Sequence, residues 1–309
     1  MIGKKEYSYG AKVMLVGEYG VILGGSALTI PFGKYHATVR TTDHIPPGSE
    51  TRATESGKYL KDLHSYILSI DKDVFHAKPD LKLFQAELQR YWLEMSIPQG
   101  YGLGSSGAVS AAIYDLFFPG SRSCSLLQQK EDLAAIESYF HGKSSGVDAL
   151  TCYTGSPLYF QSDGTIQRVE FHPARLPMGY RFFLLDSNER FDTGPLVNHF
   201  LQQMKNSGFA TSIRGEYMTI NQKLIDALLG NIDADPGLLV RVLSDFQYTH
   251  FRKMIPSNML DFWIEGQVSN EYYLKLNGSG GGFMLGITHH SSMEALENRW
   301  KKALIWIDE

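Results

Sequence analysis

The order of hydrophobic and polar positions predicts strands and helices that mix along the whole chain. Strand signals are alternation together with β-branched and aromatic residues, and helix signals are apolar residues three and four positions apart. The polar, turn-rich residues 43–58 predict a loop or a short hairpin. In the N-terminal half, strands are predicted at 7–16, 27–42, 91–98 and 149–160, and helices at 60–70, 80–91, 108–117 and 126–141.

The C-terminal half shows the same mixture without an internal repeat. A strand, a glycine turn and a second strand are predicted within residues 272–290. The pattern predicts an α/β or α+β protein of two lobes, with a border near residues 165–180. Further strands are predicted at 166–171, 180–187 and 305–309, and helices at 195–206, 213–229, 236–254 and 291–304.

The composition limits the kinds of binding partner and the cellular compartment that we expect for this protein. The 309 residues carry a net charge of −4 without a dense Lys/Arg block, so no nucleic-acid partner is expected. The apolar runs are far shorter than the ~20 residues that span a membrane. Cys124 and Cys152 are the only cysteines and form no CxxC pair, which argues against a disulfide framework or a structural zinc site. Without signal-peptide features at the N-terminus, a cytoplasmic protein is predicted.

A glycine-rich loop with a serine pair, GYGLGSSG at 100–107, precedes the predicted helix at 108–117. Glycines let backbone N–H groups crowd around an anion, and a helix N-terminus adds partial positive charge. The hydroxyls of Ser105 and Ser106 suit a phosphate oxygen or a magnesium ion. The spacing matches neither a Walker A loop nor a dinucleotide fingerprint. The alternative is a tight turn with a serine N-cap.

Two further segments combine charge with glycine. In ESYFHGKSSGVD, Glu137 and Asp148 could divide metal ligation and hydroxyl activation, or be a solvated helix residue and an N-cap. In AKVMLVGEYGVILGG, Lys12 lies in an apolar strand and Glu18 in a glycine-flanked turn. Lys12 is either on a solvated face or a partner for a substrate oxygen or a carboxylate.

A run of glycines, KLNGSGGGFMLGIT, joins the two strands within residues 272–290. Glycines cost conformational entropy, and a hairpin needs fewer of them. The run therefore indicates close approach of the backbone to a neighbouring loop or to a ligand.

Taken in order, these segments resemble the three motifs of the GHMP kinases. The motifs are Lys-x-x-x-x-Gly-Glu from Lys12, Gly-Leu-Gly-Ser-Ser from Gly102 and Gly-x-Gly-Gly-Gly from Gly278. The resemblance extends from Lys12 to about Gly286. It implies an α+β, two-lobed fold with an N-terminal lobe (1–170) like domain 2 of ribosomal protein S5 and a ferredoxin-like C-terminal lobe (171–309). ATP and Mg²⁺ would lie in the cleft between the lobes.

The resemblance also implies residue roles. Asp148 would be the catalytic carboxylate, with Lys12 facing it, and Ser106 and Glu137 would bind magnesium. Glu18, Tyr19 and Thr193 match positions near the substrate. The positions that match ATP-binding residues are Gly102, Leu103, Gly104, Ser105, Ser106, Gly107, Gly278, Gly280 and Gly281.

The phosphoryl acceptor is less sharply indicated. The HGKSSGVD segment resembles mevalonate kinases of isoprenoid precursor synthesis, whereas Tyr19 and Gly107 resemble phosphomevalonate kinases. Mevalonate is the predicted acceptor. The alternatives are phosphomevalonate, another GHMP small-molecule kinase, and a non-catalytic ATP-binding regulator. A homodimer is left open. The cations considered for a second phosphate are Arg190, Lys143 and Lys34.

Overall fold

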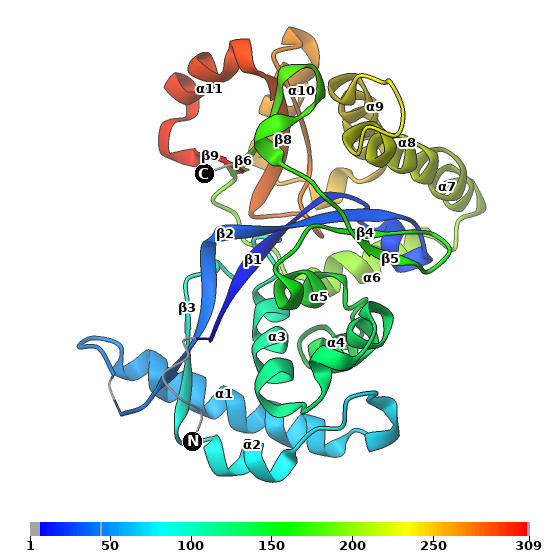
Figure 1. The fold of residues 1–309 in the computed structure, drawn as a ribbon. Coiled ribbons are helices and arrows are strands. Elements are labelled where there is room, and N and C mark those ends of the chain that lie inside the picture. Colours follow the sequence, from blue (N-terminus) through cyan, green and yellow to red (C-terminus); the bar gives the residue numbers. More distant parts are fainter. Residues whose placement is uncertain (1–6, 44, 308–309) are drawn as a thin grey trace. The chain divides into compact units, whose positions relative to one another are not determined.

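The structure, a computed structural model, describes residues 7–43 and 45–307 (Figure 1). These residues form two compact units, each of which is described by itself. Unit 1 comprises residues 7–12, 31–98 and 104–156, and unit 2 comprises 13–30, 99–103 and 157–307. The units are interleaved along the chain, and the lobe boundary at residue 170 stays a prediction.

The first sheet has five strands, of which β1 and β2 contribute residues to both units. Its order is β1-β2-β4-β5, and β3 also pairs with β2. The β2–β3 pairing is antiparallel, with Thr38 opposite Glu94, and β2–β4 is antiparallel, with Leu28 opposite Tyr159. The strands are β1 (Tyr7–Val16), β2 (Ala27–Thr41), β3 (Tyr91–Met95), β4 (Leu158–Phe160) and β5 (Ile166–Arg168).

The helices of unit 1 pack around α3, which is buried along most of its length. Figure 1 shows α3 beside α4 and α5, and α4 begins with a capping box of Ser125 and Gln128. Gly142 ends α4 with φ 75°. The helices are α1 (Glu50–Ser69), α2 (Leu81–Glu87), α3 (Ser105–Phe117), α4 (Leu126–His141) and α5 (Val147–Thr154).

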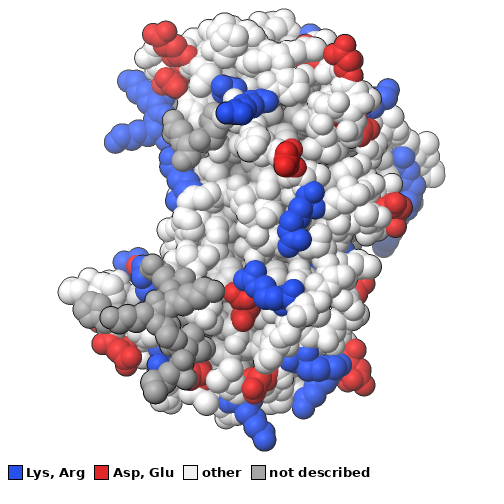
Figure 2. Space-filling model, in the orientation of Figure 1, with Lys and Arg blue, Asp and Glu red and all other residues white. Residues whose placement is uncertain are grey.

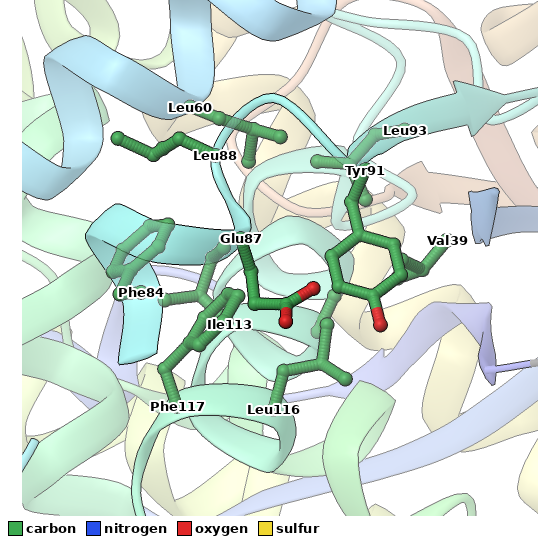
Figure 3. Close-up of a pocket in the computed structure, with 11 residues that line it drawn as sticks. Val39, Leu60, Phe84, Glu87, Leu88, Tyr91, Leu93, Ile113, Leu116 and Phe117 are labelled. Carbon is green, nitrogen blue, oxygen red and sulfur yellow. The ribbon is translucent and has the colours of Figure 1, made fainter. Parts of the chain in front are cut away.

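A small cavity lies in the apolar core of unit 1, between α1, α2, α3 and the strands β2 and β3 (Figure 3). Its volume of about 10 Å³ is room for about one water molecule. Ile113, Leu116 and Phe117 reach it from the C-terminal end of α3, whereas Ser105 and Ser106 are at the other end of that helix. This cavity is therefore neither large enough nor placed for a nucleotide.

Unit 2 contains the second sheet, of order β7-β8-β6-β9, with antiparallel pairings throughout. Gly286 lies opposite Phe183, and a Cβ at Gly286 would be 2.1 Å from the phenyl ring, so this strand position requires glycine. The strands are β6 (Tyr180–Asp186), β7 (Tyr272–Leu276), β8 (Phe283–His289) and β9 (Leu304–Trp306). The helices are α6 (Thr193–Gln203), α7 (Ser207–Ser212), α8 (Met218–Leu228), α9 (Pro236–His250), α10 (Leu260–Ser269) and α11 (Met293–Trp300), and a π-helix (Ile213–Tyr217) precedes α8.

Two secondary-structure predictions are wrong. Residues 43–58 were expected to be a loop or hairpin, but α1 begins at Glu50, because its first turns are polar and only Ala53 is buried there. Residues 149–160 were expected to be a strand, but Val147–Thr154 is helical. That helix is buried on almost every side, so it carries no helical periodicity.

Candidate active site

Lys12 and Asp148 form an ion pair in unit 1. The Lys12 nitrogen lies 2.9 Å from Asp148 Oδ2; the lysine side chain is fully buried, whereas that of Asp148 is 31% exposed. Among the described residues, the ammonium makes no aligned hydrogen bond. A buried ammonium without an aligned hydrogen bond lowers the stability of the fold. Because the side chain is buried, the solvated-face alternative for Lys12 is wrong.

Asp148 is held in place by the packing of α5 against α3 and α4. It lies in the first turn of α5, after Gly146 at φ 73°. A Cβ at Gly146 would be 2.3 Å from the Lys130 carbonyl, and one at Gly107 would be 2.9 Å from the backbone of Asp148 and Ala149. Both positions need glycine, because only then can the three helices approach closely enough to fix the Asp148 backbone.

Glu137 lies on α4 with its carboxylate buried between two serine hydroxyls. Ser106 Oγ donates to Glu137 Oε1 at 3.0 Å, and Ser144 Oγ donates to Oε2 at 2.5 Å. Ser144 Oγ also accepts from Gly146 N–H at 3.0 Å. Ser144 therefore links the Glu137 carboxylate to the start of the helix that carries Asp148. With only 3% of Glu137 exposed, the solvated-helix alternative is wrong.

Burial, and after it the nearby Asp148 charge, raise the pKa of Glu137 to about 7, against the lowering effect of Ser144, Ser106 and Lys12. The negative charge of Asp148 thus disfavours ionisation of the desolvated Glu137 carboxyl. A cation would relieve this repulsion.

The donor set fits Mg²⁺. The described part of the chain contains no cluster of three or more His, Cys, Asp or Glu side chains that could hold a metal ion. Magnesium does not need one, because it is commonly bound by one or two carboxylates together with waters and substrate phosphates. The Ser106 hydroxyl and the Glu137 carboxylate are hard oxygen ligands, and they lie in contact with each other.

The loop that leads into α3 has glycine in the left-handed conformation at three alternate positions. Gly100, Gly102 and Gly104 have φ of 77°, 74° and 73°. The N-cap of α3 is Gly104, and Ser105 and Ser106 are already helical. The serine N-cap alternative is therefore wrong. Ser106 is instead placed in the first turn of α3, where helix N–H groups and partial positive charge favour an anion.

In unit 2, the glycines at 278–282 form a turn between β7 and β8, called the glycine turn below. A Cβ at Gly102 would be 2.3 Å from the Asn277 carbonyl, and one at Gly282 would be 2.3 Å from Tyr101 Cα. One at Gly280 would be 2.3 Å from the Met254 carbonyl. The predicted close approach to a neighbouring loop is confirmed for residues 99–103. Contact of this turn with ATP stays a prediction.

Glu18 has a partner that sequence reasoning missed. Its carboxylate forms a fully buried ion pair with Lys275 of β7. Lys275 also donates to the Leu276 carbonyl at 2.7 Å, and Tyr217 donates to the Glu18 carbonyl at 2.9 Å. The signal available in the sequence was a lysine within a fully apolar strand, YYLKL, since such a residue needs a buried counter-charge.

Tyr19 and Thr193 both meet Ser279 of the glycine turn. Tyr19 Oη donates to the Ser279 carbonyl at 2.6 Å, and Thr193 Oγ1 lies 3.1 Å from Ser279 Oγ. The three residues predicted near the substrate are therefore bound, within unit 2, to Lys275 or Ser279. Their contact with substrate stays a prediction.

The cations considered for a second phosphate belong to both units. Lys34 and Lys143, in unit 1, and Arg190, in unit 2, are exposed. Arg190 donates to Gln99 Oε1 at 3.1 Å, beside the glycine loop. On the face shown in Figure 2, Lys and Arg side chains are interspersed with Asp and Glu.

One family model and several solved structures are similar to this chain. Residues 72–156 match the family model of the GHMP kinases N terminal domain. Mevalonate kinase of L. major in complex with R-mevalonate is 16% identical with a TM-score of 0.63, over 98% of this chain and 95% of that one. Phosphomevalonate kinase of Streptococcus pneumoniae, in complex with phosphomevalonate and AMPPNP, is 16% identical with a TM-score of 0.63, over 98% of both chains. Galactokinase of Lactococcus lactis is 13% identical with a TM-score of 0.64, over 98% of this chain and 92% of that one.

A search among curated proteins gave no match. At identities this low, the solved structures establish a shared fold. Residues 72–156 thus match the N-terminal domain of the GHMP kinases, and the chain shares its fold with solved mevalonate kinase, phosphomevalonate kinase and galactokinase structures. The α+β GHMP kinase fold predicted from the sequence is thereby confirmed. Within the described ranges, no helix is both long and apolar enough to cross a membrane.

Proposed function

We propose that the protein transfers the γ-phosphoryl group of ATP to a hydroxyl of a small molecule, with mevalonate as the acceptor. The observation that carries this proposal is the Lys12–Asp148 pair, whose carboxylate interacts electrostatically with Glu137 of the Ser106–Glu137–Ser144 cluster within unit 1. A buried ammonium, a partly exposed carboxylate and a hard-oxygen cation site are the groups that phosphoryl transfer uses.

Asp148 accepts the proton of the acceptor hydroxyl or orients that hydroxyl for in-line attack. Its 31% exposure leaves the carboxylate accessible to a substrate, unlike the buried Glu137. Lys12 donates to the oxygen on which negative charge develops, and its burial strengthens that interaction. Ser106 and Glu137 hold magnesium, which, when bound, supplies positive charge that offsets the charge of the phosphates.

The nucleotide side is assigned to two backbone elements. The first turn of α3, from Ser105 to Gly107, offers N–H groups to the phosphates. The glycine turn at Gly278, Gly280 and Gly281, together with Gly102 to Gly104, contributes further backbone N–H groups without Cβ clashes. Thr193 is assigned to the transferred phosphate, and Glu18, sealed in its ion pair with Lys275, holds the first motif in place without touching the substrate.

Mevalonate is chosen on the HGKSSGVD segment, whose Ser144 and Gly146 fix the two carboxylates. The L. major enzyme of the same fold is described in complex with R-mevalonate, and the Streptococcus pneumoniae enzyme with phosphomevalonate. Phosphomevalonate and another small-molecule alcohol are therefore the alternative acceptors. We place the reaction in the cytoplasm, and a homodimer is compatible with it.

The test is ADP release with ATP and magnesium against mevalonate, 5-phosphomevalonate, homoserine and galactose. Turnover with mevalonate well above that with the other compounds supports the proposal. Turnover with 5-phosphomevalonate alone would make that compound the acceptor instead of mevalonate. ATP binding without turnover on any acceptor would favour the non-catalytic regulator. Calorimetry with the non-hydrolysable AMPPNP measures that binding independently of the chemistry.

A further inference from the structure

The turn of the first motif contains a strained backbone at Tyr19. This residue has φ 60° and ψ −41°, and Gly20 N–H donates to the Glu18 carbonyl at 2.5 Å. Those values describe a γ-turn of positive φ, a conformation that side-chain-bearing residues rarely adopt. Such a residue persists only where its surroundings over-determine it, and strain of this kind concentrates at functional sites.

The surroundings of Tyr19 do over-determine it. Its side chain is 3% exposed, with the ring centroid 4.8 Å from that of Phe200 and 5.2 Å from that of Phe251. The hydroxyl donates to the Ser279 carbonyl at 2.6 Å. Tyr19 thus extends from its own turn to the middle of the glycine turn, 260 positions later in the chain.

The neighbouring residue ties the same two segments together. Glu18 is ion-paired with Lys275, in the strand that enters the glycine turn. Tyr217, the last residue of the π-helix, donates to the Glu18 carbonyl and accepts from Gln247 at 3.1 Å. The entry to the glycine turn is therefore held through Glu18, and its middle through Tyr19.

We propose that Tyr19 is a positioning residue of the glycine turn and acts on the nucleotide side of the reaction. The inference rests on the proposed function, in which that turn binds the ATP phosphates. With its carbonyl held by Tyr19, Ser279 presents its hydroxyl to Thr193 and keeps the backbone of the turn in one shape. Tyr19 then takes no part in reading the acceptor, and its presence in GEYG says nothing about a second acceptor phosphate.

Tyr19→Phe removes the hydroxyl alone, and Tyr272→Phe is its matched control. Tyr272 is also a buried tyrosine of unit 2 whose hydroxyl donates to a backbone carbonyl, that of Phe262, at 2.7 Å. AMPPNP binding is measured by calorimetry without acceptor, and amide hydrogen exchange is followed in the peptide 277–283. We expect Tyr19→Phe to raise the AMPPNP Kd about five- to tenfold and to speed exchange in this peptide. The acceptor KM should stay unchanged, and Tyr272→Phe should leave all three values at the wild-type level.

Tyr19→His is the second variant, because an imidazole cannot place a donor where the phenol hydroxyl lies. It should weaken AMPPNP in the same way without changing the preference between mevalonate and 5-phosphomevalonate. A changed acceptor preference, or an AMPPNP Kd and exchange rate equal to those of Tyr272→Phe, overturns the inference alone. A wild-type protein that does not bind AMPPNP overturns the proposed function instead.

Discussion

Two ion pairs that involve a fully buried lysine begin six positions apart in the described chain, at Lys12 and Glu18, and differ in the exposure of the carboxylate. The first is called the exposed pair, after its carboxylate, and the second the sealed pair. Lys12 pairs with Asp148 in unit 1, where the carboxylate is 31% exposed, while Glu18 pairs with Lys275 in unit 2, where both side chains are fully buried. An accessible charge can meet a substrate, whereas a sealed one can only hold its neighbours. The exposure of the carboxylate therefore distinguishes the pair that we propose is catalytic from the pair that holds its neighbours.

The largest effect is expected at the exposed pair. Asp148→Ala should lower kcat by about 10²–10⁴-fold, since it removes the group that accepts or orients the hydroxyl proton. AMPPNP binding, measured by calorimetry, should remain close to wild type. The control is Asp115→Ala, which removes another ion-paired carboxylate of unit 1, the partner of Arg122. Near-normal turnover of Asp148→Ala would mean that the pair is structural.

Substitution in the sealed pair should lower the free energy of unfolding. Lys275→Met leaves Glu18 charged and without its partner in the interior, which we expect to cost about 3–5 kcal/mol in the free energy of unfolding. Urea denaturation measures it. Lys12→Met should cost less, because Asp148 can be hydrated. The double variant Glu18→Gln/Lys275→Met should recover part of the loss, and equal losses in the single and double variants would contradict a buried charge pair.

The carboxylate next to the exposed pair should make metal binding depend on pH. Because the pKa of Glu137 is raised to about 7, its ionised form, which binds the cation, grows as pH rises through that value. Mn²⁺ affinity, followed by electron paramagnetic resonance, should tighten up to about tenfold per pH unit below 7 and level off above it. Glu137→Gln should bind weakly at every pH, and an unchanged profile in this variant would exclude Glu137 as the ligand.

The same pKa sets the sign of a stability change. Between the ordinary pKa of 4.5 and about 7, the folded protein holds a proton on Glu137 that the unfolded chain has lost. The metal-free protein should therefore lose stability as pH rises through this window, and added Mg²⁺ should reverse the loss.

The smallest effect is expected at Ser144. Ser144→Ala removes one of the two hydrogen bonds that orient the Glu137 carboxylate, and we expect Mn²⁺ affinity to fall about tenfold. Ser145→Ala is the matched control, because its hydroxyl accepts only a 3.4 Å contact from Val147 N–H. If both variants bind Mn²⁺ equally well, Ser144 does not position the carboxylate.

The candidate site residues could be predicted from the sequence because they lie in short, recognisable motifs. Ser106, Glu137 and Asp148 were singled out because their segments, taken in order along the chain, resemble the GHMP kinase motifs, and the structure brings the three residues together in unit 1. By contrast, α10 went unpredicted. Its Ile264 and Val268 are exposed while Trp263 and Gly266 are buried, so the hydrophobic pattern does not mark the inner face.

The sequence by itself predicted the α+β GHMP kinase fold, which is confirmed, and the residues that we propose carry the chemistry. Only the tertiary structure decided that Glu18 pairs with Lys275 and that the Asp148 carboxylate stays partly exposed. It also decided that Val147–Thr154 is a helix and that Tyr19 meets Ser279. The physical reason is that burial and side-chain pairing depend on contacts between segments up to 260 positions apart in the chain. A local sequence pattern does not show which distant segments come into contact.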